Sequence, residues 1–374
     1  MPVNIRDLLI LSHIPGIGSN RLRALVNHFG DPHEVGRASA HQLIRVEGIE
    51  RKTALAVVSF LRGPAAGAAE RFANDQISRI DKLGGRIVSF WDPDYPSNLK
   101  RIYDPPPFLF VRGEFREADG SSIAIVGTRN PTPYGTGLGE RFASDLARLG
   151  LTVVSGLARG IDTTAHAAVL RSHGRTIAVI GSGVDVIYPA ENKPLAERIV
   201  EQGAVVSEYE MGAKPDAVNF PRRNRIISGM TLGTLVVETG LEGGAMITAT
   251  IALDQNREVF AIPSAITERR VSGTNRLIKE GKALLTESVA DILGELGPRI
   301  KALLKDRAAA SPEPPQDLTL FERRLFDVMD ENPAHIDLLA GRAGLSASET
   351  LVHLLSLEFK GIVRQLPGKM FLRN

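Results

Sequence analysis

The sequence predicts an α/β protein whose main domain is a doubly wound parallel sheet. Between residues 122 and 293, short β-branched apolar runs alternate with helical stretches. The runs are apolar throughout instead of alternating with polar residues, as expected of strands buried on both faces of a sheet. At 374 residues the chain is longer than one hydrophobic core usually organises, so further domains are expected beside this one.

Six segments are expected to form the strands of the main domain. The lengths of chain between them suit right-handed crossover helices. The segments are SIAIVG at 122–127, LTVVSG at 151–156, TIAVIG at 176–181, AVVSE at 204–208, TLVVE at 234–238 and EVFAI at 258–262. Before them, residues 84–113 contain five prolines, which exclude a long helix and predict a strand, a Pro-rich connector and a second strand.

Residues 1–65 predict a separate helical domain. Two similar pieces, LLILSHIPGIGSNRLRALV and HQLIRVEGIERKTALAVV, each have the pattern of a helix, a glycine-containing hairpin and a helix. They resemble paired helix-hairpin-helix motifs, which elsewhere hold the DNA backbone through hairpin amides. A small helical packing module is the alternative, because the second piece lacks the second hairpin glycine. GPAAGAA at 63–69 is predicted as a hinge into the core domain, which is placed at 66–307.

A third domain is expected after a linker. Residues 308–317 are rich in Ala and Pro without apolar periodicity, which is typical of a linker. Residues 318–374 predict three helices followed by two short strands, the pattern of a winged-helix domain. Winged helices bind duplex DNA or protein, and the third helix here offers few basic side chains, so both alternatives stay open.

The composition excludes several kinds of site. The chain contains no cysteine, which removes disulfides, thiolate zinc sites, iron–sulfur clusters and thiol catalysis, and no metal site is expected. The N-terminal apolar run is interrupted too early for a membrane span or a signal peptide, so a cytoplasmic protein is expected. A formal net charge of +2 does not by itself indicate a nucleic-acid binder, because phosphate contacts need local clusters of Lys and Arg.

Glycine turns with arginines follow the first two strands of the main domain. In an open parallel sheet, ligands bind beyond the carboxyl ends of the strands, near the point where the strand order reverses. Glycines there let backbone amides approach an anion, and each following helix directs its positive end toward the same cleft. The candidate binding residues from these two turns are Gly127, Thr128, Arg129, Asn130, Ser155, Gly156, Arg159 and Gly160.

A third candidate segment is FPRRNR at 220–225, which we expect to precede a helix starting near Ile226. It contains three arginines and no acidic residue, and the arginine fork suits phosphate oxygens and stacks on bases. An aromatic ring can stack on a base and an amide can bond its edge, although packing under the loop is an equal alternative for Phe220. The candidates from this segment are Phe220, Arg222, Arg223, Asn224 and Arg225.

The motifs of nucleotide-dependent enzymes do not fit. The first turn reads GTRNPTPYG instead of G-x-G-x-x-G, no acidic residue closes the second strand, and no Walker A sequence occurs, so no cofactor is expected. Asp162 and His166 lie four residues apart on one expected helix, and Glu238 ends a strand at the cleft. Helix capping or support of the site is the commoner role of such residues, so no catalytic residue is assigned and the chain is not expected to be an enzyme.

At this point the assembled strings resemble the DprA/Smf family of bacterial DNA-processing proteins. They occur in family order over residues 90–285, and the flanking domains match family members that carry both accessories. The strings are DPDYPSNLKRIYDPPPFLFVRG, IAIVGTRNPTPYG, VVSGLARGIDTTAHAAVL, AVIGSGVDVIYPAEN, FPRRNRIISGM, VVETGLEGGAMITA and GTNRLIKEGKALL.

The resemblance implies a homodimer, built through a Rossmann-like core, that binds and shields single-stranded DNA and delivers it to the recombinase RecA, typically in natural transformation. A single-stranded-DNA-binding protein is a further implied partner. A role in general recombination instead of DNA uptake stays open. The matching positions carry over all three groups of candidates as DNA contacts and add Lys214. One departure is Ser264, where the family usually has glycine. A backbone with positive φ would be strained at a serine, so the loop after Pro263 is expected to be arranged differently from that of the family.

Two other functions compete with this one. A nucleotide-processing hydrolase resembling lysine-decarboxylase-like proteins would share a related cleft, but their PGGxGT signature is missing. A transcription factor acting through the winged helix would bind duplex DNA sequence-specifically and would lose DNA binding if the chain were cut after Pro315.

Overall fold

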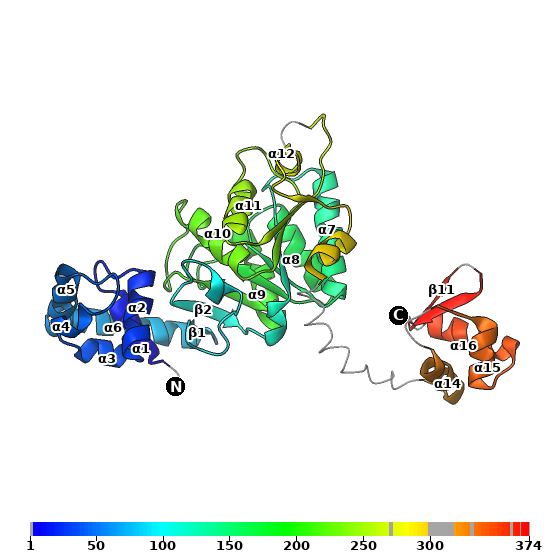
Figure 1. Cartoon of the computed structure of the whole chain (residues 1–374), viewed down its shortest axis with the longest axis horizontal. Helices are drawn as coiled ribbons and strands as arrows, with labels where there is room; N and C mark the ends of the chain where they lie inside the picture. Colours follow the sequence, from blue (N-terminus) through cyan, green and yellow to red (C-terminus); the bar gives the residue numbers. More distant parts are fainter. Residues whose placement is uncertain are drawn as a thin grey trace. The chain divides into compact units, whose positions relative to one another are not determined.

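The computed structural model of the chain describes residues 3–268, 272–297, 318–329, 333–359, 362–366 and 368–373 (Figure 1). The contacts divide the chain into two compact units, Met1–Leu303 and Leu304–Asn374. The predicted linker at 308–317 lies outside the described residues. Among the helices that the structure describes, none has the length and apolar character to cross a lipid bilayer.

The N-terminal part is helical, and both predicted helix-hairpin-helix pieces are present. Gly16 and Gly48 make the two hairpins, each with φ in the left-handed region where a side chain would be strained (+84° and +76°). The guanidinium of Arg21 donates to the carbonyls of both glycines, at 2.8 and 3.1 Å, and so ties the hairpins together. The helices are α1 (Ile5–Ser12), α2 (Ser19–Phe29), α3 (Pro32–Arg37), α4 (Ala40–Leu43), α5 (Arg51–Arg62) and α6 (Ala65–Lys82).

The hinge predicted at 63–69 is wrong. Helix α6 begins at Ala65 and continues for 18 residues, so most of the alanine-rich segment is helical. Alanine has the highest helix propensity, and Pro64 stands at the N-cap, where its missing N–H removes no helical hydrogen bond. Side chains of α1 and α6 share a hydrophobic cluster with the core domain, including Leu9, Ala73 and Phe110.

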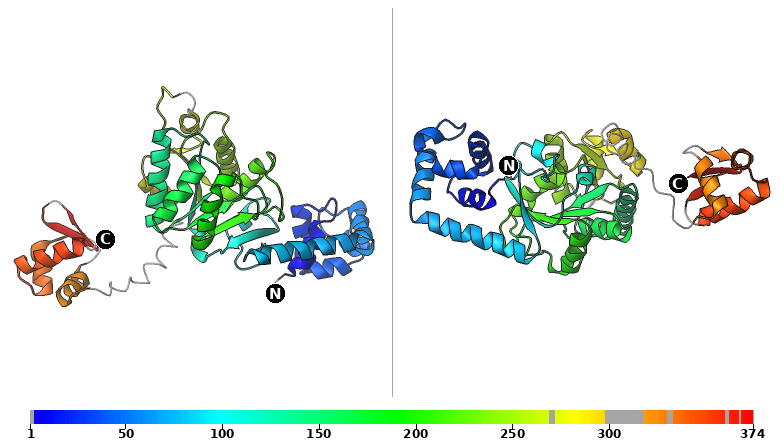
Figure 2. Two further views of the ribbon diagram at one scale, coloured as in Figure 1. Left: turned by 180° about the vertical axis from the view of Figure 1, so that it is seen from behind. Right: turned by 90° about the horizontal axis from the view of Figure 1, so that it is seen from below.

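The core domain contains a nine-stranded sheet in the order β1-β2-β6-β5-β4-β3-β7-β8-β9, with helices on both faces (Figure 2). All six predicted strands form and run parallel. The two strands predicted around the Pro-rich connector extend the sheet, β2 pairing antiparallel with β6 and β1 pairing antiparallel with β2. The strands are β1 (Arg86–Ser89), β2 (Phe108–Gly113), β3 (Ser122–Val126), β4 (Thr152–Ser155), β5 (Thr176–Val179), β6 (Ala204–Ser207), β7 (Gly233–Val236), β8 (Glu258–Ala261) and β9 (Leu284–Leu285).

Each face of the sheet buries one side of β3. Ile123 and Ile125 face a cluster with helices α7 and α8, while Ala124 and Val126 face a cluster with α10 and α11. Strand order reverses at β3, because β4 to β6 follow on one side and β7 to β9 on the other. The bounds of the helices are α7 (Pro133–Arg148), α8 (Ile161–Arg171), α9 (Lys193–Gln202), α10 (Asn219–Gly229), α11 (Gly244–Asp254) and α12 (Gly273–Lys279), with short 3-10 turns at Leu99–Arg101, Glu117–Gly120 and Ala190–Asn192.

The C-terminal unit has the predicted winged-helix pattern. Three helices, α14 (Leu320–Val328), α15 (Ile336–Ala343) and α16 (Ala347–Phe359), precede two strands, β11 (Val363–Leu366) and β12 (Met370–Arg373). A short strand before α15, β10 (Ala334–His335), joins them in a three-stranded sheet. Exposed side chains on α16 include Leu351 and Val352, and the helix sequence ASETLVHLLSLEF contains no Lys or Arg.

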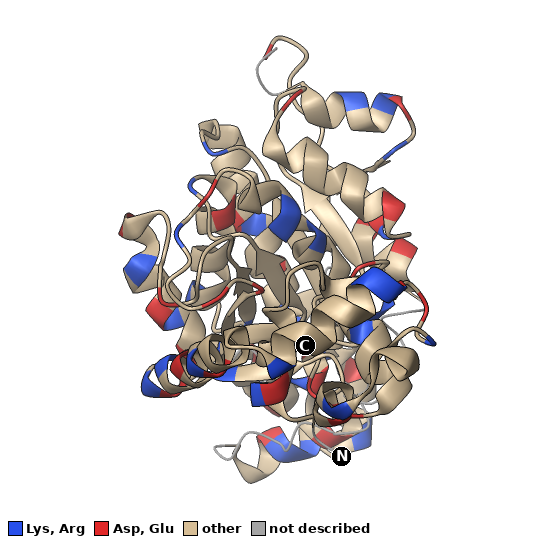
Figure 3. Cartoon of the chain, turned by 90° about the vertical axis from the view of Figure 1, so that its left-hand side faces the viewer, with Lys and Arg blue, Asp and Glu red and all other residues tan. Residues whose placement is uncertain are grey.

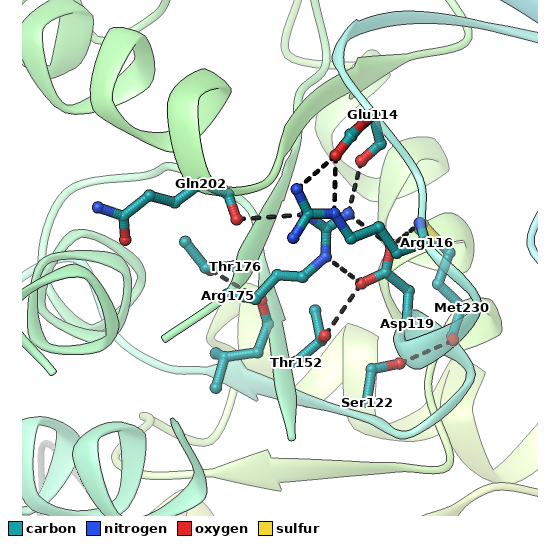
Figure 4. A network of polar contacts seen from close by, with 10 residues as sticks. Glu114, Arg116, Asp119, Ser122, Thr152, Arg175, Thr176, Gln202 and Met230 are labelled. Carbon is teal, nitrogen blue, oxygen red and sulfur yellow. Dashed lines mark hydrogen bonds and ion pairs between the residues drawn. The ribbon is translucent and has the colours of Figure 1, made fainter. Parts of the chain in front are cut away.

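The edge of the sheet at the amino ends of the parallel strands is held by one buried ion pair (Figure 4). Arg175 Nε donates to Asp119 Oδ1 at 2.6 Å, and the two side chains are only 13% and 5% exposed. The same guanidinium donates to the carbonyls of Glu114 and Gln202, and Thr152 Oγ1 donates to Asp119. This network fixes the segment that leads from β2 into β3.

Replacing Asp119 by Ala is expected to destabilise the core by about 3–5 kcal/mol, because it leaves the buried guanidinium of Arg175 without its carboxylate. The measurement is urea unfolding followed by circular dichroism. Glu140→Ala is the matched control, since the Glu140–Arg171 pair is exposed and worth about 0–1 kcal/mol. Equal losses in the two variants would contradict a special role for the buried pair.

Candidate nucleic-acid interface

A cleft of about 730 Å³ opens at the carboxyl ends of the strands, where the strand order reverses. Its two sides are joined by a hydrogen bond from Thr128 N, after β3, to Glu238 O, after β7, at 2.7 Å. The walls come from the turn after β3, from α10 and from the segment leading into α11. The candidates that the structure brings to this cleft are Gly127, Thr128, Arg129, Phe220, Arg223 and Asn224.

The turn after β3 is anchored by a buried carboxylate. Glu238 accepts hydrogen bonds from Thr132 N and Thr132 Oγ1, both at 2.8 Å, and so fixes the start of α7. Gly127 is required here, because a Cβ would lie 2.4 Å from the side chain of Ile161. Arg129 projects from this turn into solvent, with its guanidinium 5.5 Å from the centre of the Phe220 ring.

The turn after β4 is held by a second buried carboxylate. Asp162, in the first turn of α8, accepts hydrogen bonds from Gly156 N at 3.1 Å and Ala158 N at 3.4 Å. Burial raises the pKa of the Asp162 carboxyl, while the nearby Arg223 opposes that rise. Two amides of the turn are therefore already hydrogen-bonded to Asp162. Gly160 completes the turn with a φ of +76°. Ser155 is buried and donates to Ile125 O at 2.6 Å, so it supports the turn from beneath.

The segment at 220–225 is not a loop before a helix, as the sequence suggested, because helix α10 begins at Asn219. Pro221 is the third helical residue, where the first-turn N–H groups have no partner within the helix and a proline is tolerated. The helix therefore turns the adjacent Arg222 and Arg223 to different faces. Arg222 is exposed, Arg223 is buried and Arg225 is half-buried.

Arg223 is committed to the protein interior. Its guanidinium donates to Val179 O, at the end of β5, and to Gly156 O at 2.7 Å. Burial lowers the pKa of Arg223 to about 10, with Asp162 acting in the opposite direction. Although its side chain borders the cleft, it is 4% exposed, and its hydrogen bonds hold the ends of two strands together.

Two further predicted arginines are paired with carboxylates. Arg225 bonds Asp104 at 2.9 Å and Glu208 at 2.5 Å. Arg159 bonds both carboxylate oxygens of Glu191, at 2.6 and 2.8 Å, in an exposed ion pair. Arg159 and Gly156 line a smaller notch next to the main cleft.

Among the residues that the structure describes, three of the predicted cations are exposed and have no carboxylate partner. They are Arg129, Lys214 and Arg222. Basic and acidic positions are otherwise interspersed along the ribbon (Figure 3). Lys214 and Arg222 do not line the cleft itself; Lys214 lies on the loop before α10 and Arg222 on that helix.

Tyr188 is a cleft residue that was not predicted from the sequence. Its ring lies 5.8 Å from that of Phe220, centre to centre, borders both the cleft and the notch, and is 44% exposed. Tyr188 follows β5 within the string AVIGSGVDVIYPAEN, so its place beyond a strand end was a usable signal. The far wall of the cleft, Thr239 to Thr248, was also not predicted to take part.

The groups weighed for catalysis all have structural partners. Asp162 and Glu238 hold the two turns described above. His166 is fully buried, and its Nδ1 lies 2.7 Å from Thr176 Oγ1. Because that hydroxyl donates to Val153 O, Nδ1 carries the imidazole proton and donates to Thr176. The described residues contain no group of His, Asp and Glu arranged to hold a metal ion.

Ser264 does not adopt the backbone conformation that would strain a serine, since it is not among the described residues with positive φ. Its N–H donates to Asn275 Oδ1 at 2.9 Å, and its carbonyl accepts from Asn275 Nδ2 at 2.8 Å. The amide of Asn275 thus holds this loop in a backbone conformation that serine adopts readily.

The fold is that of an α/β protein with a doubly wound, mostly parallel sheet, to which a helix-hairpin-helix tandem and a winged helix are attached. The chain belongs to the DprA/Smf family. The profile described as DNA recombination-mediator protein A matches residues 86–297, that of the DprA winged helix domain matches 309–369, and that of the SAM-like helix-hairpin-helix tandem matches 8–62. This confirms the resemblance seen in the sequence and the predicted fold class.

Relatives support the same assignment over most of the chain. Protein Smf of Synechocystis sp. is 33% identical, with 98% of each chain covered, and Protein Smf of Escherichia coli is 42% identical, covering 73% of this chain and 74% of the relative. The solved structure of DNA processing protein A from Streptococcus pneumoniae has a TM-score of 0.67 at 31% identity, over 79% of this chain and 99% of that one. A structure described for the single-stranded DNA binding mode of DNA processing protein A from Helicobacter pylori has a TM-score of 0.51 at 28% identity, over 60% and 98%.

The buried state of His166 predicts a pH dependence of stability. Burial lowers the pKa of His166 to about 3, whereas an unfolded histidine has a pKa of about 6.5. Between these values the unfolded chain binds a proton that the native protein excludes, so stability falls as the pH is lowered through this window. His166→Leu is expected to flatten the fall between pH 6.5 and 5 by up to about 1.4 kcal/mol per pH unit.

Urea unfolding at several pH values between 7 and 5 measures this slope, and His41→Leu, at an exposed histidine, is the control. Identical slopes in wild type and His166→Leu would show that His166 is not held neutral in the native protein.

Proposed function

We propose that this chain binds single-stranded DNA in the cleft at the carboxyl ends of its parallel strands. The observation that carries the proposal is the grouping of an exposed, unpaired arginine, Arg129, with two aromatic rings, Phe220 and Tyr188, at a cleft floored by glycine turns. Stacking on aromatic rings and cation contacts along a groove are the means by which proteins bind single strands without reading sequence. The Helicobacter pylori relative, whose structure is described for single-stranded DNA binding, supports the same assignment.

The candidate residues divide into two groups in this proposal. Those facing solvent contact the strand: the cations bind phosphates, the rings stack on bases, and the turn backbones donate to phosphate oxygens. The contacting group comprises Gly127, Thr128, Arg129, Asn130, Arg159, Gly160, Lys214, Phe220, Arg222 and Asn224, with Tyr188 added. Gly156 is buried, with its N–H on Asp162 and its carbonyl on Arg223, so it joins Ser155, Arg223 and Arg225 in positioning the turns and the helix from within.

Arg159 needs one change to take part. It must exchange the carboxylate of Glu191 for a phosphate, which is a small cost because both side chains are more than half exposed. Arg129 needs a similar change. When a base stacks on Phe220, the guanidinium now 5.5 Å from that ring is free to move onto the adjoining phosphate.

We further propose that bound strands are protected and passed to RecA, for homologous recombination in natural transformation, in the cytoplasm where those partners meet. The family description as a recombination mediator supports this role. A homodimer is part of the proposal, because the exposed edge strand β9 presents Leu284 and Leu285, each 44% exposed, as an unpaired apolar edge. A single-stranded-DNA-binding protein is a further partner on the same strands. No nucleotide hydrolysis is expected, since Asp162 and Glu238 hold the turns of the cleft.

A salt titration tests the cleft directly. Binding to oligo-dT is expected to be tighter than binding to a duplex of equal length. The slope of log affinity against log salt concentration is expected to be smaller in magnitude by about 0.7 in each of the single variants Arg129→Ala and Arg222→Ala. Arg198→Ala, an exposed arginine on α9, controls for loss of one positive charge and is expected to leave the slope unchanged.

If duplex binds more tightly, or if the control lowers the slope as much as Arg129→Ala does, the cleft is not the binding groove. Arg223→Ala is unsuitable for this titration, because the loss of its bonds to Gly156 and Val179 alters the cleft itself.

Removal of the chain after Pro315 separates the proposed role of the core from that of the winged helix. The truncated chain is expected to retain its affinity for oligo-dT within about threefold, because unit Met1–Leu303 is compact by itself and α16 supplies no Lys or Arg. Fluorescence anisotropy with labelled oligo-dT and labelled duplex measures both affinities. Abolished binding in the truncated, folded chain would favour a transcription factor that acts through the winged helix.

A further inference from the structure

Tyr103 presents its ring almost entirely to solvent, with 91% of the residue exposed. The segment that carries it is nevertheless firmly held. On its C-terminal side, Tyr95 donates from its hydroxyl to Pro106 O at 2.7 Å, and on its N-terminal side Ile102 is buried. Three successive prolines at 105–107 restrict the backbone further. An aromatic ring held out on a fixed segment has no packing role that explains it.

The residue that follows Tyr103 is bonded to α10, the helix that begins at the cleft. Asp104 accepts from Arg225 Nε at 2.9 Å, which joins the Tyr103 segment to α10. Phe220 lies at the cleft end of that helix, five residues or about 7.5 Å along the axis from Arg225. Arg222 lies between them and shares a face with Arg225.

The charges along this route favour phosphate. Arg101, two residues before Tyr103, is exposed and has no carboxylate partner among the residues described, as is true of Arg222. Two acidic groups next to this segment, Asp104 and Glu208, share the guanidinium of Arg225, which offsets one of their two negative charges. A strand leaving the cleft therefore meets free cations and a free ring, with the intervening carboxylates already paired.

We propose that Tyr103 is a second stacking platform, on which a base of the same single strand lies after it leaves the cleft past Arg222, with Arg101 bound to a neighbouring phosphate. This inference rests on the proposed function, since it requires a strand in the cleft. The helical domain contacts the same Pro-rich connector, because Arg23 of α2 donates a hydrogen bond to Pro105 O. Tyr188 and Phe220 hold bases inside the cleft, and Tyr103 holds one outside it.

Two oligonucleotide lengths separate the inner from the outer platform. An oligo-dT of about six nucleotides fills the cleft alone, and one of about 20 nucleotides also reaches Tyr103. Tyr103→Ala in the full chain is expected to weaken binding of the long oligonucleotide about tenfold, the effect of losing one stacked base, and to leave the short one unchanged. Tyr103→Phe keeps the stacking face and is expected to restore wild-type affinity.

Tyr134→Ala is the matched control, because that tyrosine is also exposed (57%) but lies at the start of α7 with its hydroxyl toward Pro263 O. It is expected to change neither affinity. Arg101→Ala is expected to lower the salt slope by about 0.7 for the long oligonucleotide only. A 2-aminopurine placed outside the cleft-bound nucleotides is expected to be quenched by wild type and not by Tyr103→Ala.

The failures are distinguishable. If Arg129→Ala weakens both oligonucleotides while Tyr103→Ala weakens neither, the cleft holds the strand and the outer platform is wrong. If Tyr103→Ala weakens the short and the long oligonucleotide equally, Tyr103 is not outside the cleft and the inference is also overturned. If the wild type binds neither oligonucleotide, the proposed function itself fails.

Discussion

The buried guanidinium of Arg223 is the contact on which the geometry of the cleft depends. It joins the carbonyl of Gly156, after β4, to that of Val179, at the end of β5, and it faces the carboxyl of Asp162. Asp162 in turn accepts from the amides of the turn after β4, so α8, α10 and two strand ends meet at one charged pair. Removing either member would leave an uncompensated charge in the interior, where such charges are costly. The cleft thus has a fixed shape before any ligand enters.

Because the cleft is held in this way, the arginines around it differ in whether they are able to bind a ligand. A guanidinium that already bonds carbonyls or carboxylates in the interior has few donors left for a ligand, whereas Arg129 and Arg222 keep all of theirs. In the proposed binding mode, the interior charges lower the reorganisation needed when DNA arrives, and the exposed ones supply the salt-dependent attraction. Both groups are arginines, but they serve binding in different ways.

The sequence was sufficient for the sheet and insufficient for the arginines. Apolar runs identify parallel strands because both faces are buried, and all six were found, while the two-residue strand β9 is too short to leave such a pattern. The partners that distinguish Arg225 from Arg222 lie far away in the chain: Asp104 is 121 residues distant. No spacing rule connects them, and the helical start at Asn219, which sends adjacent arginines to different faces, was hidden by Pro221. Tyr188 was missed for a related reason, since its nearness to Phe220 arises only when β5 and α10 pack together.

Similar hydrogen bonds within the protein explain why the cleft is better suited to holding a strand than to cleaving one, although acidic residues and a histidine lie around it. A general base must reach the substrate with a free lone pair. Here Glu238 has both oxygens engaged by Thr132, Asp162 accepts amides of its own turn, and His166 is shut away beneath the sheet. Asp162 and Glu238 could be freed only by opening the turns that they support, which would remove the glycine backbone that we propose binds phosphate. A side chain that stabilises the cleft in this way is not available to react with a bound strand, and these residues stabilise the cleft.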